Sequence, residues 1–315
     1  MKGLSLAGRM LGRRNPCGMR WGIIVAKARG RLQVIATPIG NLADLSPRAQ
    51  EALRGADVIA AEDTRHTLVL LQAMGIARPR VSLHDHNELE RVPELLARLA
   101  DGQTVALVSD AGTPLLSDPG FELVRQAAAA GFAVHAIPGP SAITAALAGA
   151  GLPARRFCFE GFLPARERER RAALAALAHE PRTLVFFEAP HRIAATLADM
   201  AAEFGGERAA VVARELTKVH ETFYRGSLAQ LHERAQHEEN FARGEITVVV
   251  HGAAAAADGG FDEAQLRRTV DVLLRELPPG RAAAVAAQLT GAPRASAYAL
   301  ALKRGTAPQE PEATS

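Results

Sequence analysis

Short apolar runs alternate with stretches of helical periodicity over residues 32–150, and no other feature of the sequence restricts the fold as much. Residues 32–36 and 104–109 are apolar runs of strand length, and Gly and Pro follow each of them. Between them, Ser46 and Pro47 are typical of the start of a helix, since Ser caps a helix N-terminus and Pro fits its first turn. This alternation predicts an α/β domain with a largely parallel sheet.

A change of rhythm after residue 150 divides the chain. Strand-like runs become more closely spaced there, which predicts a second α/β domain with some antiparallel pairing. Further on, a run of Ala and Gly is typical of a linker, and Pro-Gly breaks separate two or three short helices. We therefore predict a disordered extension at 1–31, α/β domains at 32–150 and 151–252, a linker at 253–261, a small helical domain at 262–303 and a disordered tail at 304–315.

Composition excludes several classes of protein. A hydrophobic content of 48% in 315 residues supports sizeable cores and argues against a disordered chain. The net charge of +3 is compatible with nucleic-acid binding but is far below that of a dedicated phosphate-backbone binder. The two cysteines, Cys17 and Cys158, form no CxxC, and no apolar run is long enough to span a bilayer. We expect a cytoplasmic protein with no disulfide framework and no membrane segment.

Three loops rich in Gly and Pro follow predicted strands, at residues 36–41, 109–114 and 137–141. Ligands of open α/β sheets bind outside the carboxyl ends of the strands, where Gly permits close approach and Pro fixes the loop. No GxGxxG follows the first strand, and no GxxxxGK[ST] occurs. The loops therefore predict a cleft for a cofactor held through main-chain amides and apolar contacts, rather than for a dinucleotide or a P-loop nucleotide.

Polar clusters follow two further strands, at residues 62–67 and 84–88. The His-Asp-His sequence at 84–86 contains the residue types of metal sites, but helix caps and turns use the same residues, and we expect no metal. Similar clusters at 188–192 and 214–221 are either functional or solvated charges at element ends.

Together these segments resemble the tetrapyrrole methylase superfamily. They lie in order along the chain: ATPIGNL at 36–42, AEDTRHT at 61–67, HNE at 86–88, VSDAGTP at 108–114, SDPG at 117–120, PGPSA at 138–142, FEGFLP at 159–164, PHR at 190–192 and VARELTK at 212–218. AEDTRHT and VARELTK are typical of a subfamily that methylates RNA, rather than of the porphyrin and corrin methylases. The departures are Leu115 and Leu116, where the family has Gly-Ile, and Phe187 and Ala189, where Tyr and Ser are usual.

The resemblance implies two α/β domains of the tetrapyrrole methylase type, a homodimer, and S-adenosyl-L-methionine in a cleft between the domains. Pro38 would line the first loop, and Ser109 and its neighbours would contact the amino-acid end of the cofactor. Carried over motif by motif, the cofactor-binding residues are Pro38, Ser109, Asp110, Ala111, Ser141, Ala142, Phe187, Leu216 and Ile246.

The resemblance also implies an acceptor, the ribose 2′-oxygen of a cytidine in the decoding region of 16S rRNA in the small ribosomal subunit. The small helical domain would then be an RNA-binding module. A ribose hydroxyl is a weak nucleophile, so a nearby base would assist an in-line transfer that depends mainly on positioning. The candidate bases, among which the sequence does not choose, are Asp63, His84, His86, Glu88 and Glu188. The candidates for RNA phosphate contacts, each of which could equally form an internal ion pair, are Arg65, Arg192, Arg214 and Lys218.

Two alternatives remain open at this point. A methylase of porphyrin or corrin precursors would use the same loops with another acceptor. A noncatalytic RNA-binding protein is the alternative outside the enzymes, although the modest net charge and the aromatic content of 4% argue against it.

Overall fold

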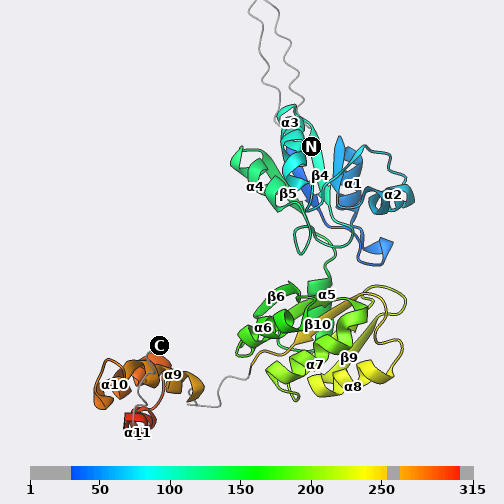
Figure 1. Cartoon of the computed structure of the whole chain (residues 1–315). Helices are drawn as coiled ribbons and strands as arrows, with labels where there is room; N and C mark the ends of the chain where they lie inside the picture. The colour runs from blue at the N-terminus through cyan, green and yellow to red at the C-terminus, as the bar shows by residue number, and fades with distance from the viewer. Residues whose placement is uncertain (1–29, 254–262, 306–315) are drawn as a thin grey trace, which may run out of the picture. The chain divides into compact units, whose positions relative to one another are not determined.

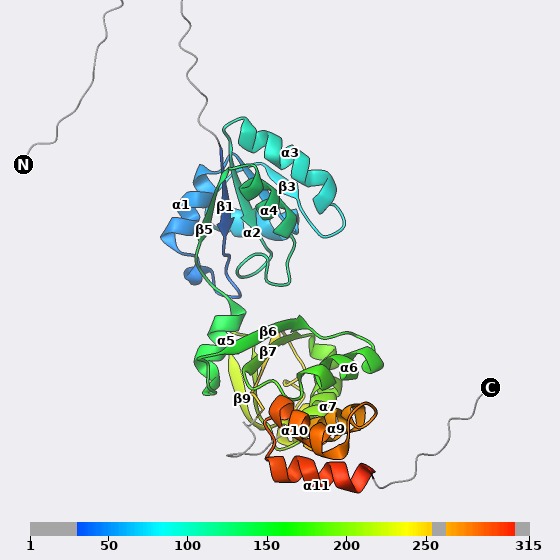
Figure 2. The same cartoon turned by 90° about the vertical axis from the view of Figure 1, so that its left-hand side faces the viewer.

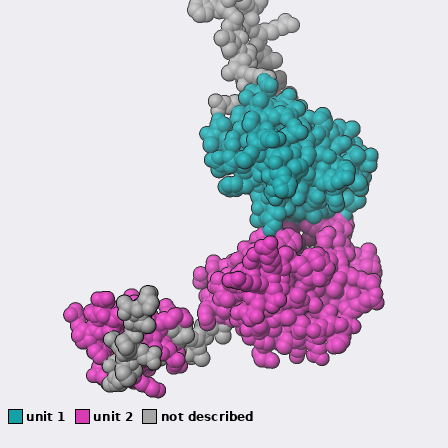
Figure 3. All heavy atoms as spheres, viewed as in Figure 1, with its two compact units in different colours: residues 1–38, 42–140 teal, residues 39–41, 141–315 magenta. Residues whose placement is uncertain are grey.

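The computed structural model describes residues 30–253 and 263–305. The described chain forms two compact units, one of residues 30–38 and 42–140 and the other of residues 39–41 and 141 onward (Figures 1 and 3). The predicted extension at 1–31, the linker at 253–261 and the tail at 304–315 lie almost entirely outside the described residues. No helix in the described ranges is long and apolar enough to cross a bilayer.

The first unit is built on a five-stranded sheet in the order β3-β2-β4-β1-β5, and every neighbouring pair is parallel. Helices must therefore connect the strands, and they cover both faces of the sheet (Figure 2). Because all five strands run the same way, their carboxyl ends share one edge. The strands are β1 (Arg31–Ile35), β2 (Val58–Ala61), β3 (Arg80–Ser82), β4 (Thr104–Val108) and β5 (Ala133–Ile137).

Each face of this sheet has its own core. On one face, Leu53 of α1 (Pro47–Gly55) and Leu71 of α2 (Thr64–Ala73) are buried against the strands. On the other face, α3 (Glu88–Ala100) and α4 (Phe121–Ala129) bury Leu95 and Leu123. The N-terminus of α1 has the predicted cap, because the Ser46 hydroxyl accepts a hydrogen bond from the Ala49 amide at 3.1 Å.

The second unit holds a mixed sheet in the order β6-β7-β10-β8-β9, in which only β6 and β7 are parallel. Helices α6 (Glu167–Leu177), α7 (Ile193–Phe204) and α8 (Leu228–His237) pack on one face, and α5 (Ala142–Ala150) packs on the other. The strands are β6 (Phe157–Phe162), β7 (Thr183–Glu188), β8 (Ala209–Arg214), β9 (Thr222–Ser227) and β10 (Ile246–Val250).

Three short helices near the C-terminus enclose a separate small core. They are α9 (Glu263–Leu273), α10 (Pro279–Thr290) and α11 (Arg294–Gly305). Leu266 and Val270 of α9 pack against buried alanines of α10 and α11, so small side chains bring these helices close together.

The predicted α/β fold class is confirmed, with a parallel first sheet and antiparallel pairing in the second. The division between the units, however, falls after Pro140 rather than after residue 150. The reason is packing: Ile143, Ala146 and Leu147 of α5 are buried against β8 and β10 of the second sheet.

Candidate active site

The loops after β1 and β4 are joined at the carboxyl edge of the first sheet. The Thr37 amide donates to the Gly112 carbonyl at 2.9 Å, and the Gly112 amide donates back to the Thr37 carbonyl at 3.1 Å. The buried Thr37 hydroxyl also donates to the Ser109 carbonyl at 3.2 Å. Three hydrogen bonds thus fix the main chain around Pro38, Ser109, Asp110 and Ala111, the predicted cofactor residues of this unit.

The loop after β5 lies against the first of these loops. A Cβ atom added to Gly139 would lie 3.0 Å from the Ala36 Cβ, which is tighter than most such contacts, so glycine favours this close approach. The Thr113 hydroxyl donates to the Pro140 carbonyl at 3.0 Å. All three predicted Gly/Pro loops therefore meet at one edge.

Acidic side chains gather at the same edge. Glu62 follows β2, Asp110 follows β4, and Asp118 lies in the loop before α4. Burial raises the pKa of Glu62, and the charge of Asp110 raises it further. Burial and then the charge of Glu62 raise the pKa of Asp118 to about 6. No ion pair joins any of the three to a basic residue within the described ranges, so the edge favours a cationic ligand.

Glu62 and Asp118 belong to this cluster although neither was predicted as a site residue. A signal was available, since each lies in a motif that follows or closely follows a predicted strand. Their proximity depends on β2 and β4 being neighbours in the sheet, which the sequence order does not reveal.

Two of the candidate bases are committed to helix ends. Asp63 caps α2, accepting from the Arg65 amide at 2.7 Å, and Arg65 holds the pKa of its carboxyl down at about 2. Glu88 reaches the start of α4, where its Oε1 accepts from the amides of Glu122 at 2.8 Å and Leu123 at 3.3 Å.

The two histidines lie just beyond β3, with ring centroids 6.0 Å apart. The His84 amide donates to Asn87 Oδ1 at 2.8 Å, and the Asn87 side-chain amide donates to the Ser82 carbonyl at 3.2 Å, so the turn is fixed. The His84 Nδ1 is buried and has no hydrogen-bond partner among the described residues. His86 is exposed.

Glu188, the fifth candidate base, is buried in the second unit. Its Oε2 accepts from the Thr196 hydroxyl at 2.5 Å, and its Oε1 accepts from the Ala189 amide at 2.7 Å. The Arg192 guanidinium lies 3.3 Å from the same Oε1. This carboxylate therefore holds β7 and α7 together, and its side chain is only 1% exposed.

The predicted cofactor residues of the second unit separate into two sets. Ser141 precedes α5 at its N-cap position, and Ala142, Phe187 and Leu216 share one apolar cluster on the α5 face of the sheet. Ile246 belongs to the cluster on the opposite face, with α7 and α8. The side chain of Ile246 thus packs apart from the other residues, although its main chain is paired with that of Glu188, next to Phe187.

The predicted phosphate-binding cations mostly have internal partners. Arg214 is 8% exposed, and its guanidinium donates to the carbonyls of Arg243 at 2.7 Å and His220 at 3.3 Å. Lys218 bridges Glu215 at 2.9 Å and Glu245 at 3.1 Å. Arg192 donates to the carbonyls of Leu163 and Pro164, besides pairing with Glu188. Arg65, paired with Asp63 at 3.0 Å, has a 90% exposed side chain and is the most accessible of the four.

Comparison with known proteins agrees with the fold. Residues 31–232 match the family model of Tetrapyrrole (Corrin/Porphyrin) Methylases, and residues 261–305 match that of the RsmI C-terminal HTH domain. The methyltransferase CobJ superposes with a TM-score of 0.55 at 22% identity, over 71% of this chain and 95% of its own. Diphthine synthase gives 0.54 at 19% identity, over 70% and 90%. At these identities the likeness concerns the fold, which is that of a tetrapyrrole methylase.

Relatives in sequence are more specific. Ribosomal RNA small subunit methyltransferase I of Xylella fastidiosa strain Temecula1 is 55% identical over 269 residues, which is 85% of this chain and 98% of the relative. The proteins of the same name from Pseudomonas aeruginosa and Escherichia coli O157:H7 are 52% and 47% identical, over 87% and 88% of this chain and 98% and 96% of their own. The chain belongs to the ribosomal RNA small subunit methyltransferase I family.

Proposed function

We propose that this protein is an S-adenosylmethionine-dependent methyltransferase that methylates the ribose 2′-oxygen of a cytidine in the decoding region of 16S rRNA. The observation that carries the proposal is the 55% identity, over 98% of its length, to a relative named as a small-subunit ribosomal RNA methyltransferase. We further propose that it acts as a homodimer in the cytoplasm, on the small ribosomal subunit.

The carboxyl edge of the first sheet fits this cofactor by its charge. S-adenosylmethionine carries a sulfonium and an α-ammonium group against a single carboxylate. Glu62, Asp110 and Asp118 have no cationic partner among the described residues, and the raised pKa of Asp118 reflects its burial and then repulsion by the charge of Glu62. A bound cation would relieve that repulsion.

Main-chain groups complete the proposed cofactor site. The loops at Pro38 and at Ser109, Asp110 and Ala111 are fixed by the Thr37–Gly112 hydrogen bonds, so little ordering cost remains for binding. In the second unit, Ser141, Ala142, Phe187, Leu216 and Ile246 stay in the proposed set, and Ile246 would contribute through its main chain because its side chain lies on the other face of the sheet.

The cofactor, when bound, supplies an electrophilic methyl group, and the chain has to orient the acceptor hydroxyl and take its proton. Among the five candidate bases, Glu88 and Glu188 are engaged with main-chain amides, and Asp63 is engaged with Arg65. His84 has a fixed main chain, and of its two ring nitrogens only Nδ1 is buried without a partner among the described residues. We therefore assign proton acceptance to the other ring nitrogen of His84, Nε2.

Methylation of purified small ribosomal subunits that lack this modification tests the proposal. With S-adenosylmethionine labelled in the methyl group, nucleoside mass spectrometry should find the label in 2′-O-methylcytidine. Label in a corrin precursor supplied in parallel would instead favour the tetrapyrrole alternative. Absence of S-adenosylmethionine binding to the folded protein, measured by calorimetry, would leave only the noncatalytic alternative.

His84→Gln and His86→Gln form a matched pair for the base. The first should lower kcat by about 10²–10⁴-fold, because general-base assistance is of that order. The second should leave kcat nearly unchanged, because the proposed proton acceptor is still present. Equal effects of the two substitutions would contradict the assignment.

A further inference from the structure

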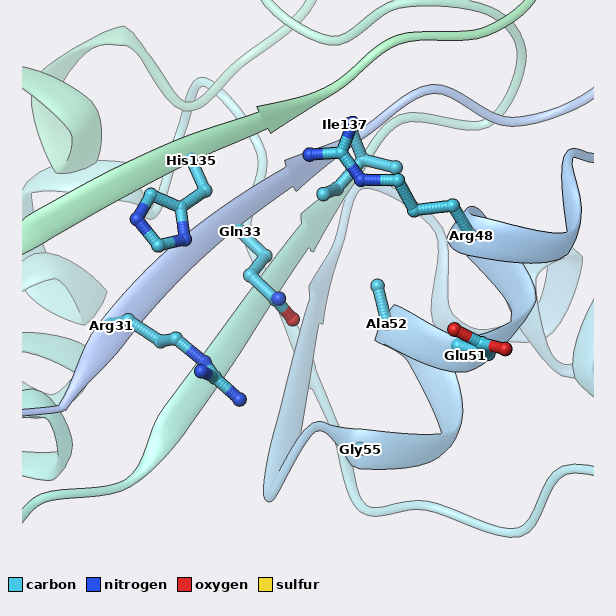
Figure 4. Close-up of a pocket in the computed structure, with 8 residues that line it drawn as sticks. All are labelled: Arg31, Gln33, Arg48, Glu51, Ala52, Gly55, His135 and Ile137. Carbon is cyan, nitrogen blue, oxygen red and sulfur yellow. The ribbon is translucent and has the colours of Figure 1, made fainter. Parts of the chain in front are cut away.

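A second polar site lies on the first unit, away from the joined loops. An open pocket of about 260 Å³ is bounded by α1 on one side and by β1 and β5 on the other. Figure 4 shows Arg31 and Arg48 approaching this space from β1 and from α1, with Gln33 and His135 on the neighbouring strands. Ile137 contributes an apolar wall.

The pocket interrupts an otherwise apolar face of the sheet. Ile35, Ala106 and Val108 on this face are buried under α1 and α2. Side chains of a strand alternate between faces, so Arg31 and Gln33 lie on the same face as Ile35. His135 is the register partner of Gln33 on β5. Where the helices no longer cover the sheet, the chain thus presents a guanidinium, an amide and an imidazole side by side.

The side chains of Arg31, Arg48 and His135 have no partner within the described residues. No hydrogen bond or ion pair joins these three side chains to another residue there, whereas the side chains of Arg91, Arg125, Arg182 and Arg234 are all paired with nearby carboxylates. Glu51 borders the pocket on α1 but pairs with neither arginine. Two permanent positive charges against one negative charge leave the pocket basic.

We propose that this pocket binds a phosphate group of the RNA backbone, and the proposal rests on the methylation of ribosomal RNA proposed above. Guanidinium groups match the geometry of phosphate oxygens, and the Gln33 amide and the His135 ring supply further donors. The pocket is open, as a phosphate on a large polyanion requires. The pocket would hold the acceptor RNA without taking part in the chemistry.

Protection of a sheet edge and binding of a small phosphate compound would also account for these charges. Charged side chains on an edge strand such as β5 can serve only to prevent pairing with another sheet. Edge protection predicts a change of association state when the charges are removed. A free phosphate-bearing small molecule could instead occupy the same donors, which predicts tight binding of inorganic phosphate with no effect on RNA.

The test uses the full chain and small ribosomal subunits that lack the methyl group. The Arg31→Ala/Arg48→Ala variant removes both cations, and Arg31→Lys/Arg48→Lys retains the charge. The matched control is Arg54→Ala/Arg91→Ala, which removes two exposed arginines from the same unit. Of these, Arg54 lies on α1 but donates to the Met74 carbonyl, and Arg91 pairs with Glu94. Filter binding across salt concentrations gives the affinity and its salt dependence, and light scattering gives the association state.

The alanine variant should bind subunits on the order of tenfold more weakly at low salt, and the magnitude of the slope of log K against log salt should fall by about 0.7–0.9, the value for one lost phosphate contact. The lysine variant should keep most of the slope, and the control should match the wild type. An unchanged slope in the alanine variant overturns the inference. Self-association of that variant would then favour edge protection, and binding of inorganic phosphate by the wild type would favour a small phosphate compound as the ligand. If the wild type still methylates subunits in that case, the proposed function stands. If the wild type neither binds nor methylates subunits, both proposals fall.

Discussion

Asp118→Asn is expected to stabilise the protein at neutral pH and to weaken cofactor binding at the same time. The carboxyl of Asp118 is half-buried and close to Glu62, and its pKa in the folded protein is about 6, against 3.8 for an ordinary aspartate. A difference of about two pKa units corresponds to about 3 kcal/mol between the two protonation states. Asparagine keeps an oxygen that can accept from the Ser109 hydroxyl but carries no charge.

The sign follows from proton linkage. The folded state holds the Asp118 proton more tightly than the unfolded state, so the contribution of Asp118 to stability is greatest below about pH 4 and falls as the pH rises to about 6. Above pH 6 the ionised Asp118 carboxylate destabilises the folded state by its full amount, up to about 3 kcal/mol. Asp118→Asn removes this cost, so its gain in stability should be largest at about pH 7.5 and should disappear near pH 4.

Urea unfolding of the wild type and the variant at about pH 4.5, 6 and 7.5 measures this dependence. The exposed Asp44, replaced by Asn, is the control for the loss of one negative charge from the same unit. Calorimetric titration of S-adenosylmethionine on the same samples should show wild-type affinity rising through about pH 6 and a flatter profile for Asp118→Asn. A stability difference that is the same at all three pH values would refute the reasoning.

Three further predictions concern other positions. Gly75→Ala should lower the free energy of unfolding by about 1–2 kcal/mol, because Gly75 has a φ of +62°, although no atom lies near the added Cβ. Gly55→Ala, at an equally open position without a positive φ, should be neutral or stabilising by up to about 1 kcal/mol. Urea midpoints compare the two variants, and equal shifts would contradict this prediction. Asp199→Ala should lower the free energy of unfolding by about 3–5 kcal/mol in the same assay, because it leaves the Arg170 guanidinium buried without a counter-charge. The Arg170 side chain is 6% exposed, and its guanidinium lies 2.6 Å from the Asp199 carboxylate. A loss below about 1 kcal/mol would show that water compensates for the missing carboxylate. Asp110→Ala should lower S-adenosylmethionine affinity tenfold or more by calorimetry, and an unchanged affinity would show that the amino-acid end of the cofactor binds elsewhere.

The edge loops were predictable because local chemistry decides them. Gly and Pro directly after an apolar run mark the end of a strand. Because parallel strands end at the same edge of a sheet, the loops that follow them lie together, and hydrogen bonds join two of them at Thr37 and Gly112. The parallel first sheet and the mixed second sheet follow from the spacing of the strands in the same way.

The individual roles were less predictable, because they depend on distant partners. Glu88 lies in a conspicuous polar cluster, yet the amide it binds is 34 residues further along the chain. Arg214 ends a buried strand, and only the fold shows that main-chain carbonyls surround it. Ile246 lies in β10, where all five side chains are buried, so no alternation in the sequence indicates which face it joins.

The hydrogen bonds between the Glu88 carboxylate and the first turn of α4 have a consequence for local unfolding of the first unit. Glu88 is the first residue of α3, so a single carboxylate links the N-termini of two helices that pack on the same face of the sheet. Neither helix can fray at that end without breaking the link. The amides of Glu122 and Leu123 should therefore exchange with deuterium at the rate set by the start of α3, and the two helix ends should behave as one cooperative unit beside the joined loops.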